Sequence, residues 1–220
     1  YEIQLLVNDG SADSAPDTVI IQAFNTQPVA DAGPDQTVFV TDTVQLNGSA
    51  SSDADGDALT YQWSVISVPS GSSASLDDPT AVNPTFVVDQ PGTYEVQLIV
   101  NDGIEDSDLA TTTISTLNSK PVANAGPDQT AFVTDVVQLD GSESSDVDTD
   151  PLTFSWAFLS KPTDSTATLD DPTSSTPSFS IDKPGAYTFA LSVNDGTVDS
   201  DVATVTISTQ NSKPVAEAGP

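Results

Sequence analysis

Hydrophobic and polar residues alternate in short runs along the chain, and clusters of Gly, Pro, Asp and Ser separate these runs. Alternation with a period of two predicts β-strands, because successive side chains of a strand point to opposite faces. No segment shows the 3.6-residue apolar stripe of an amphipathic helix. Within residues 28–120 the pattern predicts strands at 36–40, 43–49, 59–66, 85–89, 93–100 and 109–116.

The same succession of runs occurs more than once. The stretch "PVADAGPDQT" begins at Pro28 and "PVANAGPDQT" at Pro121, a spacing of 93 residues, and 58 of the 93 paired positions are identical. A period of this length fits a small independent domain rather than a solenoid unit. We therefore predict complete domains at 28–120 and 121–213, preceded by the last strands of another repeat at 1–27 and followed by the start of a further repeat at 214–220.

Short strands with turn signals between them predict an all-β fold of tandem β-sandwiches, about seven strands each. Trp63 and Trp156 are predicted to lie in the cores. Phe39 and Phe132 lie between inward-facing neighbours, so alternation places them outside, either as ordinary surface residues or as contacts to a neighbouring domain or chain. In the first repeat the predicted inward positions are Val38, Val40, Val44, Leu46, Leu59, Tyr61, Trp63, Val65, Tyr94, Val96, Leu98, Val100, Ala110, Thr112 and Ile114.

The composition is strongly acidic, with 33 Asp and Glu against four Lys and a formal net charge of −29. This balance argues against nucleic acid and against an anionic membrane surface as partners, since both require clustered basic residues. No apolar run in this segment is long enough to span a membrane.

The absence of Cys and His removes the usual nucleophile–base sets and most zinc sites. Carboxylate pairs remain, at Asp77–Asp78 and Asp170–Asp171. Each pair precedes a Pro in a turn-rich loop. This position favours a structural role in a turn over a catalytic role like that of the two carboxylates of a glycosidase. We predict a chain that is not an enzyme, without catalytic or organic-cofactor residues.

Two acidic loops carry the main chemical signal, "SSDADGD" at 51–57 and "SSDVDTD" at 144–150. Three carboxylates at alternate positions can converge on a hard cation where the backbone curls around it, and calcium takes six to eight oxygen ligands. The residue spacing is not that of an EF-hand. The alternative is a solvated acidic turn that holds no ion.

The motifs "PVADAGPDQTV", "VQLNGSASSDADGDALTYQW" and "GTYEVQLIVNDG" resemble the PKD domain, an immunoglobulin-like β-sandwich found in surface proteins and secreted hydrolases. The resemblance covers the whole chain. In place of the common "DFGDG" turn, Trp63 is followed by "SVISVPSGSSASLDDPT", which is similar to the subgroup in KIAA-type surface proteins and bacterial adhesins.

The resemblance also implies a calcium site. In calcium-binding PKD domains of bacterial collagenases, an Asn just before the first Pro and Asp residues of the acidic loop hold the ion. This chain has "NTQP" at 25–28 and "NSKP" at 118–121. The implied ligands are Asn25, Asp53, Asp55 and Asp57 for one ion, and Asn118, Asp146, Asp148 and Asp150 for the other.

These observations favour a structural repeat of a long extracellular or cell-surface protein, such as a filament or adhesin stalk. The linkers contain no Gly/Ser tether, and Pro121 restricts the residue before it, so the repeats are expected to form a stiff rod that calcium rigidifies. The expected partners are neighbouring repeats and other copies of the chain. The alternatives are an accessory module of a secreted hydrolase and a module that binds carbohydrate or protein.

Overall fold

The structure is a computed structural model that describes residues 1–211, 213, 216 and 217. The chain divides into two compact units, one made mainly of residues 1–115 and the other mainly of residues 116–220. The domain boundaries at 28, 121 and 214 stay predictions. Most of the predicted following repeat, 214–220, lies outside the described residues.

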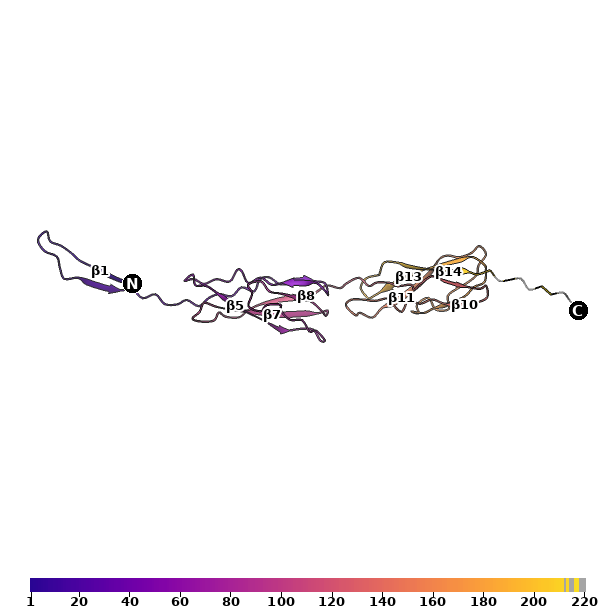
Figure 1. Cartoon of the computed structure of the whole chain (residues 1–220), viewed down its shortest axis with the longest axis horizontal. Coiled ribbons are helices and arrows are strands. Elements are labelled where there is room, and N and C mark those ends of the chain that lie inside the picture. The colour runs from indigo at the N-terminus through magenta and orange to yellow at the C-terminus, as the bar shows by residue number, and fades with distance from the viewer. Residues whose placement is uncertain (212, 214–215, 218–220) are drawn as a thin grey trace. The chain divides into compact units, whose positions relative to one another are not determined.

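All regular structure in the described residues is β-strand, as the alternation predicts, and both repeats contain the same six strands (Figure 1). No helix there is long and apolar enough to cross a membrane. The strands are β1 (Glu2–Leu5), β2 (Asp17–Ile20), β3 (Gln36–Val38), β4 (Thr43–Gln45), β5 (Thr60–Ser67), β6 (Thr85–Val87), β7 (Thr93–Asn101), β8 (Ala110–Thr116), β9 (Gln129–Ala131), β10 (Val136–Gln138), β11 (Thr153–Ser160), β12 (Ser178–Ser180), β13 (Ala186–Asn194) and β14 (Ala203–Thr209).

In the first repeat, one sheet has the strand order β3-β8-β7-β5 and a second sheet pairs β4 with β6. The long strands β5 and β7 are antiparallel, with Trp63 opposite Leu98. The short bridge between Val29 and Ser52 joins the start of the repeat to its acidic loop. Six strands and this bridge correspond to the sandwich of about seven strands that the sequence predicts.

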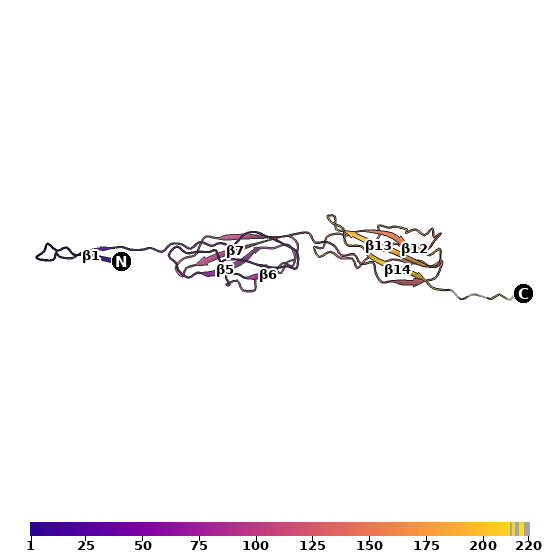
Figure 2. The same ribbon diagram turned by 90° about the horizontal axis from the view of Figure 1, so that it is seen from above.

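The second repeat has the same two sheets, with the order β11-β13-β14-β9 in one and the pair β10-β12 in the other. Figure 2 shows β13 and β14 side by side, and the two strands are antiparallel. Strand β9 joins β14 in parallel, with Gln129 opposite Ile207. The all-β tandem sandwich fold is therefore confirmed.

The cores lie between the two sheets of each repeat and contain the predicted inward residues. Trp63 and Trp156 are 1% and 3% exposed, and Tyr94 and Tyr187 are fully buried. In the second core, Phe158 and Phe189 replace Val65 and Val96, and the two rings lie with their centroids 4.4 Å apart. Burial of these aromatic side chains supplies much of the hydrophobic stabilisation of a domain this small.

The paired aspartates have the predicted turn role through their second members, since Asp78 and Asp171 accept from the backbone N–H two residues further on, at 2.9 Å each. Asp77 accepts hydrogen bonds from the backbone N–H and the hydroxyl of Thr85, at 2.7 and 2.9 Å. These bonds lower the pKa of the Asp77 carboxyl below its ordinary value. Asp170 makes the same two bonds to Ser178 at 2.7 Å each. Both carboxylates anchor the long loop after β5 or β11 to the next strand, β6 or β12.

Strands β1 and β2 form an antiparallel hairpin whose sequence matches that of β7 and β8. Ile3 and Leu5 are 52% and 61% exposed, whereas their equivalents Val96 and Leu98 are fully buried. The hairpin has the alternation of a core-facing strand pair. Its apolar side chains are uncovered within the part of the chain that the structure describes.

Candidate metal centre

Each acidic loop gathers its three aspartates into one cluster. The carboxylate oxygens that Asp53, Asp55 and Asp57 offer lie within 4.8 Å of one another, and the same holds for Asp146, Asp148 and Asp150. Like charges at this distance repel each other, and the repulsion grows where water is excluded. The backbone must therefore hold each cluster together.

In each loop, one carboxylate oxygen of the first aspartate binds the loop backbone and holds the cluster together. Asp53 Oδ1 accepts hydrogen bonds from the backbone N–H groups of Asp55 and Asp57, at 2.8 and 3.1 Å. Asp146 Oδ1 accepts from Asp148 and Asp150 at 2.8 and 3.4 Å. These Asx-type turns curl the loop and bring the alternate carboxylates together.

Carboxylate oxygens in these loops that accept no hydrogen bond indicate whether the site suits a cation. Asp53 Oδ2, Asp146 Oδ2 and Asp148 Oδ1 are buried and have no hydrogen-bond partner. Charged oxygens buried without a partner are costly, and a bound cation would remove that cost. Clustered carboxylate oxygens are also the donor type that calcium prefers. The residues therefore fit the ion that the family resemblance implies.

The segment before each repeat reaches its acidic loop through a backbone group. Thr26 N–H donates to Asp55 Oδ2 at 2.6 Å, and Ser119 N–H donates to Asp148 Oδ2. This is the contact that places Asn25 and Asn118 close to the loops. Asn25 directly precedes Thr26, and Asn118 directly precedes Ser119.

The two Asn side chains donate to carboxylates that the sequence analysis did not select. Asn25 Nδ2 donates to Asp102 Oδ2 and Asn118 Nδ2 donates to Asp195 Oδ2, both at 2.9 Å. These bonds leave the amide oxygens of Asn25 and Asn118 available to a cation. Each implied Asn thus lies beside its acidic loop and is fixed there by a third segment of the repeat.

Asp102 and Asp195 are the functional candidates that sequence reasoning missed. They are 8% and 7% exposed, although neither forms an ion pair among the described residues. Backbone N–H groups of the following turn lower the pKa of Asp102, with help from Asn25, and the Asn118 amide is the leading cause of the lowered pKa of Asp195. Asp102 and Asp195 belong to the motif "VNDG", which occurs three times in the chain. This repetition was the sequence feature that could have identified them.

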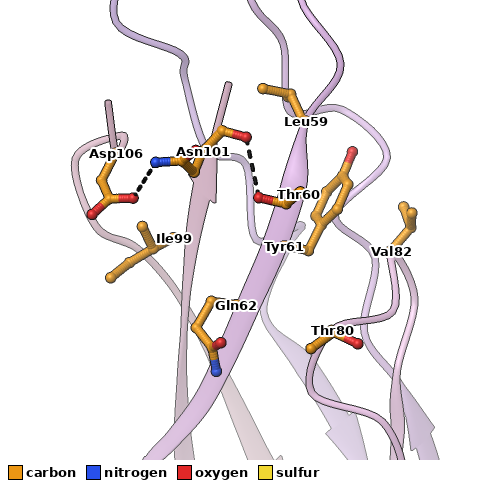
Figure 3. Close-up of a pocket in the computed structure, with 9 residues that line it drawn as sticks. All are labelled: Leu59, Thr60, Tyr61, Gln62, Thr80, Val82, Ile99, Asn101 and Asp106. Carbon is orange, nitrogen blue, oxygen red and sulfur yellow. Dashed lines mark hydrogen bonds between the residues drawn. The ribbon is translucent and has the colours of Figure 1, made fainter. Parts of the chain in front are cut away.

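A separate open hollow of about 740 Å³ lies over β5 in the first repeat (Figure 3). Two of its polar side chains bond to each other, since Asn101 donates to Asp106 at 2.7 Å, and the Thr60 hydroxyl donates to the Asn101 backbone carbonyl at 3.2 Å. Asp106 is its one carboxylate. In the second repeat, Phe154 and Ser192 replace two residues that line the hollow, Tyr61 and Ile99. The hollow presents no nucleophile–base pair.

Solved structures similar to this chain include a PKD domain and a two-domain piece of a protocadherin. The solution structure of the PKD domain from KIAA 1837 protein is 25% identical, covers 44% of this chain and 96% of that chain, and gives a TM-score of 0.36. Human Protocadherin-24 EC1-2 (form II) is 15% identical over 84% of this chain and 99% of that one, with a TM-score of 0.43.

Curated relatives match the chain from end to end. The Dyslexia-associated protein KIAA0319 homolog of Rattus norvegicus is 32% identical over 230 residues, which cover 100% of this chain and 21% of that protein. Dyslexia-associated protein KIAA0319 of Homo sapiens is 30% identical over 230 residues, which again cover 100% of this chain and 21% of that protein. The chain thus spans about a fifth of the length of the curated relatives it matches.

A family model described as "K319L-like, PKD domain" matches residues 32–116 and 125–208. The two matches follow the repeats and confirm the resemblance to PKD domains. The matched domain type is non-catalytic, so the prediction that this segment is not an enzyme is also confirmed. The matched stretches cover most of the chain, which therefore belongs to the family of K319L-like PKD domains.

Proposed function

We propose that this chain is a structural segment of a long extracellular or cell-surface protein, in which stiff PKD repeats follow one another as a filament or adhesin stalk and calcium rigidifies their junctions. The family match and the end-to-end similarity to KIAA0319 relatives support a structural or adhesive role. The short linker with Pro121 supports limited bending between repeats.

Calcium in this proposal would be held by Asp53, Asp55 and Asp57 with Asn25 in one repeat. In the other repeat, Asp146, Asp148 and Asp150 with Asn118 would hold it. When bound, the ion supplies two positive charges to clustered carboxylates in a chain of net charge −29. The observation that carries this part is the set of buried carboxylate oxygens without partners in both loops.

The position of the Asn residues explains how an ion would act on a junction. Asn25 and Asn118 lie in the segments that lead into the repeats, while their partners Asp102 and Asp195 follow β7 and β13. An ion shared between this segment and the acidic loop would fix the lead-in chain to the body of its repeat. Chain entropy lost at the junction would then be offset by metal binding.

Contacts between copies are the second part of the proposal. Phe39 and Phe132 are 46% and 43% exposed, as alternation predicts. Each follows a β-strand and is held on its turn by a carboxylate: Asp42 accepts from Phe39 N–H at 2.9 Å and Asp135 from Phe132 N–H at 2.8 Å. One exposed ring per repeat, on a turn whose backbone is held in place, would give copies of the chain repeated lateral contacts.

The calcium part is tested by thermal unfolding of the calcium-free chain with and without added calcium. At a free concentration about 100 times the Kd, one site stabilises its repeat by about 2.7 kcal/mol. For domains of this size the melting temperature should rise by at least about 10 °C. Small-angle scattering on the same samples should give a larger and less variable maximum dimension with calcium.

Sodium chloride at matched ionic strength is the control, because general screening of the acidic surface also stabilises the chain. Screening rises gradually with salt, whereas binding saturates at low calcium. Equal melting temperatures in calcium and in matched sodium chloride would refute the calcium part of the proposal and leave the family assignment in place.

A further inference from the structure

We propose that the two acidic loops bind calcium with unequal strength, the second loop (146–150) being the tight site and the first loop (53–57) the weak one. This inference rests on the calcium assignment proposed above and adds an order of affinity for the two sites. The two loops occupy equivalent places in two repeats of the same fold, so differences between their affinities must come from local differences in sequence and burial.

The first difference is burial. Asp148 is 6% exposed, whereas its equivalent Asp55 is an exposed residue. Asp150 is half-buried and its equivalent Asp57 is exposed. Attraction between a cation and a carboxylate is stronger where water is excluded, so the same three charges hold an ion more firmly in the second loop.

The second difference is the number of oxygens left without partners. The second loop has two, Asp146 Oδ2 and Asp148 Oδ1, and the first loop has one, Asp53 Oδ2. Each such oxygen has lost its water and gained no donor in exchange. Ion binding compensates two of these losses in the second loop and one in the first, which favours binding to the second.

The third difference is the stiffness of the loop backbone. Gly56 and Thr149 occupy the same left-handed turn position, with φ of 81° and 65°. Glycine reaches many other conformations, while Thr149 is far more restricted, and Pro151 fixes a backbone angle that Ala58 leaves free. The second loop therefore loses less conformational entropy when an ion orders it.

One difference acts in the opposite direction. Lys120 lies next to Ser119, whose N–H is bonded to Asp148, and the first repeat has the neutral Gln27 at this position. The Lys120 ammonium forms an ion pair with Asp201 at 2.5 Å, and both side chains are well exposed. Because this charge is paired and hydrated, its repulsion of a cation is small compared with the three effects above.

The test is isothermal titration of the calcium-free full chain with calcium chloride. We expect two binding steps whose Kd values differ by about tenfold or more, since ligand charge and site rigidity set calcium affinity over several decades. Asp148→Asn should remove the tight step and keep the weak one. The matched variant Asp55→Asn should remove the weak step and leave the tight Kd unchanged.

A loop exchange tests the third difference, the stiffness of the loop backbone, without touching a carboxylate. The variant Ala54→Val, Gly56→Thr, Ala58→Pro gives the first loop the residues of the second. We expect it to tighten the weak site to within about threefold of the strong one. An unchanged weak Kd in this variant would overturn the contribution of backbone stiffness to the ranking.

The outcomes separate this inference from the proposed function. If the wild-type chain takes up no calcium, the calcium part of the proposed function fails and the ranking fails with it. If two ions bind in a single step of equal affinity, or if Asp55→Asn removes the tight step, only the ranking is overturned. Should Asp148→Asn fail to fold by circular dichroism, Asp55→Asn and the loop exchange still decide the question.

Discussion

Individual carboxylates in this chain are held by neutral donors rather than by cations. Lys120 and Asp201 form an ion pair at the surface. Asp182 instead accepts hydrogen bonds from the Ser165 hydroxyl, the Thr166 N–H and the Tyr187 hydroxyl, at 2.6, 2.6 and 2.8 Å. The bond from Ser165 is the leading cause that lowers the pKa of Asp182 below its ordinary value of 3.8.

This network predicts a specific dependence on pH. Because the pKa of Asp182 is lower in the folded state, its contribution to stability is present above the ordinary pKa and is lost as the pH falls through the folded value. Asp182→Asn should therefore melt earlier than wild type at pH 7, and most of that difference should disappear by about pH 2.

Calorimetry from pH 7 to pH 2 checks this prediction, and Asp201→Asn is the control. Asp201 is 95% exposed in its side chain and pairs with Lys120 at the surface, so its removal should change the melting temperature little at any pH. A gap between wild type and Asp182→Asn that stays constant down to pH 2 would contradict the assigned role of the carboxylate.

At the scale of elements, a glycine after β4 and another after β10 let these segments pass directly over the core tryptophans. A Cβ on Gly48 would lie 3.1 Å from Trp63 Cζ2 and 3.0 Å from the Val82 carbonyl oxygen. A Cβ on Gly141 would lie 3.1 Å from Trp156 Cζ2. Both glycines also donate their N–H to the facing loop, so the backbone has little freedom to move away.

Gly141→Ala should therefore cost about 1–3 kcal/mol of unfolding free energy, the usual cost of overpacking a core. Chemical denaturation monitored by tryptophan fluorescence measures it. Ser155→Thr is the control, since it also adds one methyl group but at an exposed position of β11. Equal stability of Gly141→Ala and wild type would show that the segment after β10 moves aside.

Much of each element could be predicted from the sequence, and the parts that could not depend on long-range pairing. Alternation identified β7 and β8 and placed Trp63 inside, because strand periodicity is local. The contact between Asn25 and Asp102 spans 77 residues and leaves no local pattern. The contrast between buried Asp148 and exposed Asp55 was equally hidden, since both loops show the same alternate aspartates.

At the scale of the whole molecule, the proposed lateral contacts predict self-association that depends on the exposed phenylalanines. The double variant Phe39→Ser, Phe132→Ser should weaken association at least about tenfold, because aromatic anchors dominate small interfaces. Sedimentation velocity over a range of concentrations measures this. Association that is unchanged in the variant, or a wild-type chain that stays monomeric throughout, would remove this part of the proposal.

The matched control for that experiment is Val29→Ser, Val122→Ser. These valines are 63% exposed each and lie 93 residues apart, so they remove comparable apolar surface at the same period. Their replacement should leave the sedimentation behaviour unchanged. The comparison separates a contact made by the rings from general loss of surface hydrophobicity.

The bonds from Asn118 and Ser119 also decide where this chain can be cut for the study of one repeat. A fragment that begins at Pro121, where the sequence motif starts, would lose both donors. Asp195 would then lose its amide partner and Asp148 its backbone partner. A fragment that begins at Leu117 keeps them, so boundaries chosen by motif alone would produce a repeat with a damaged ion site and an artificially low affinity.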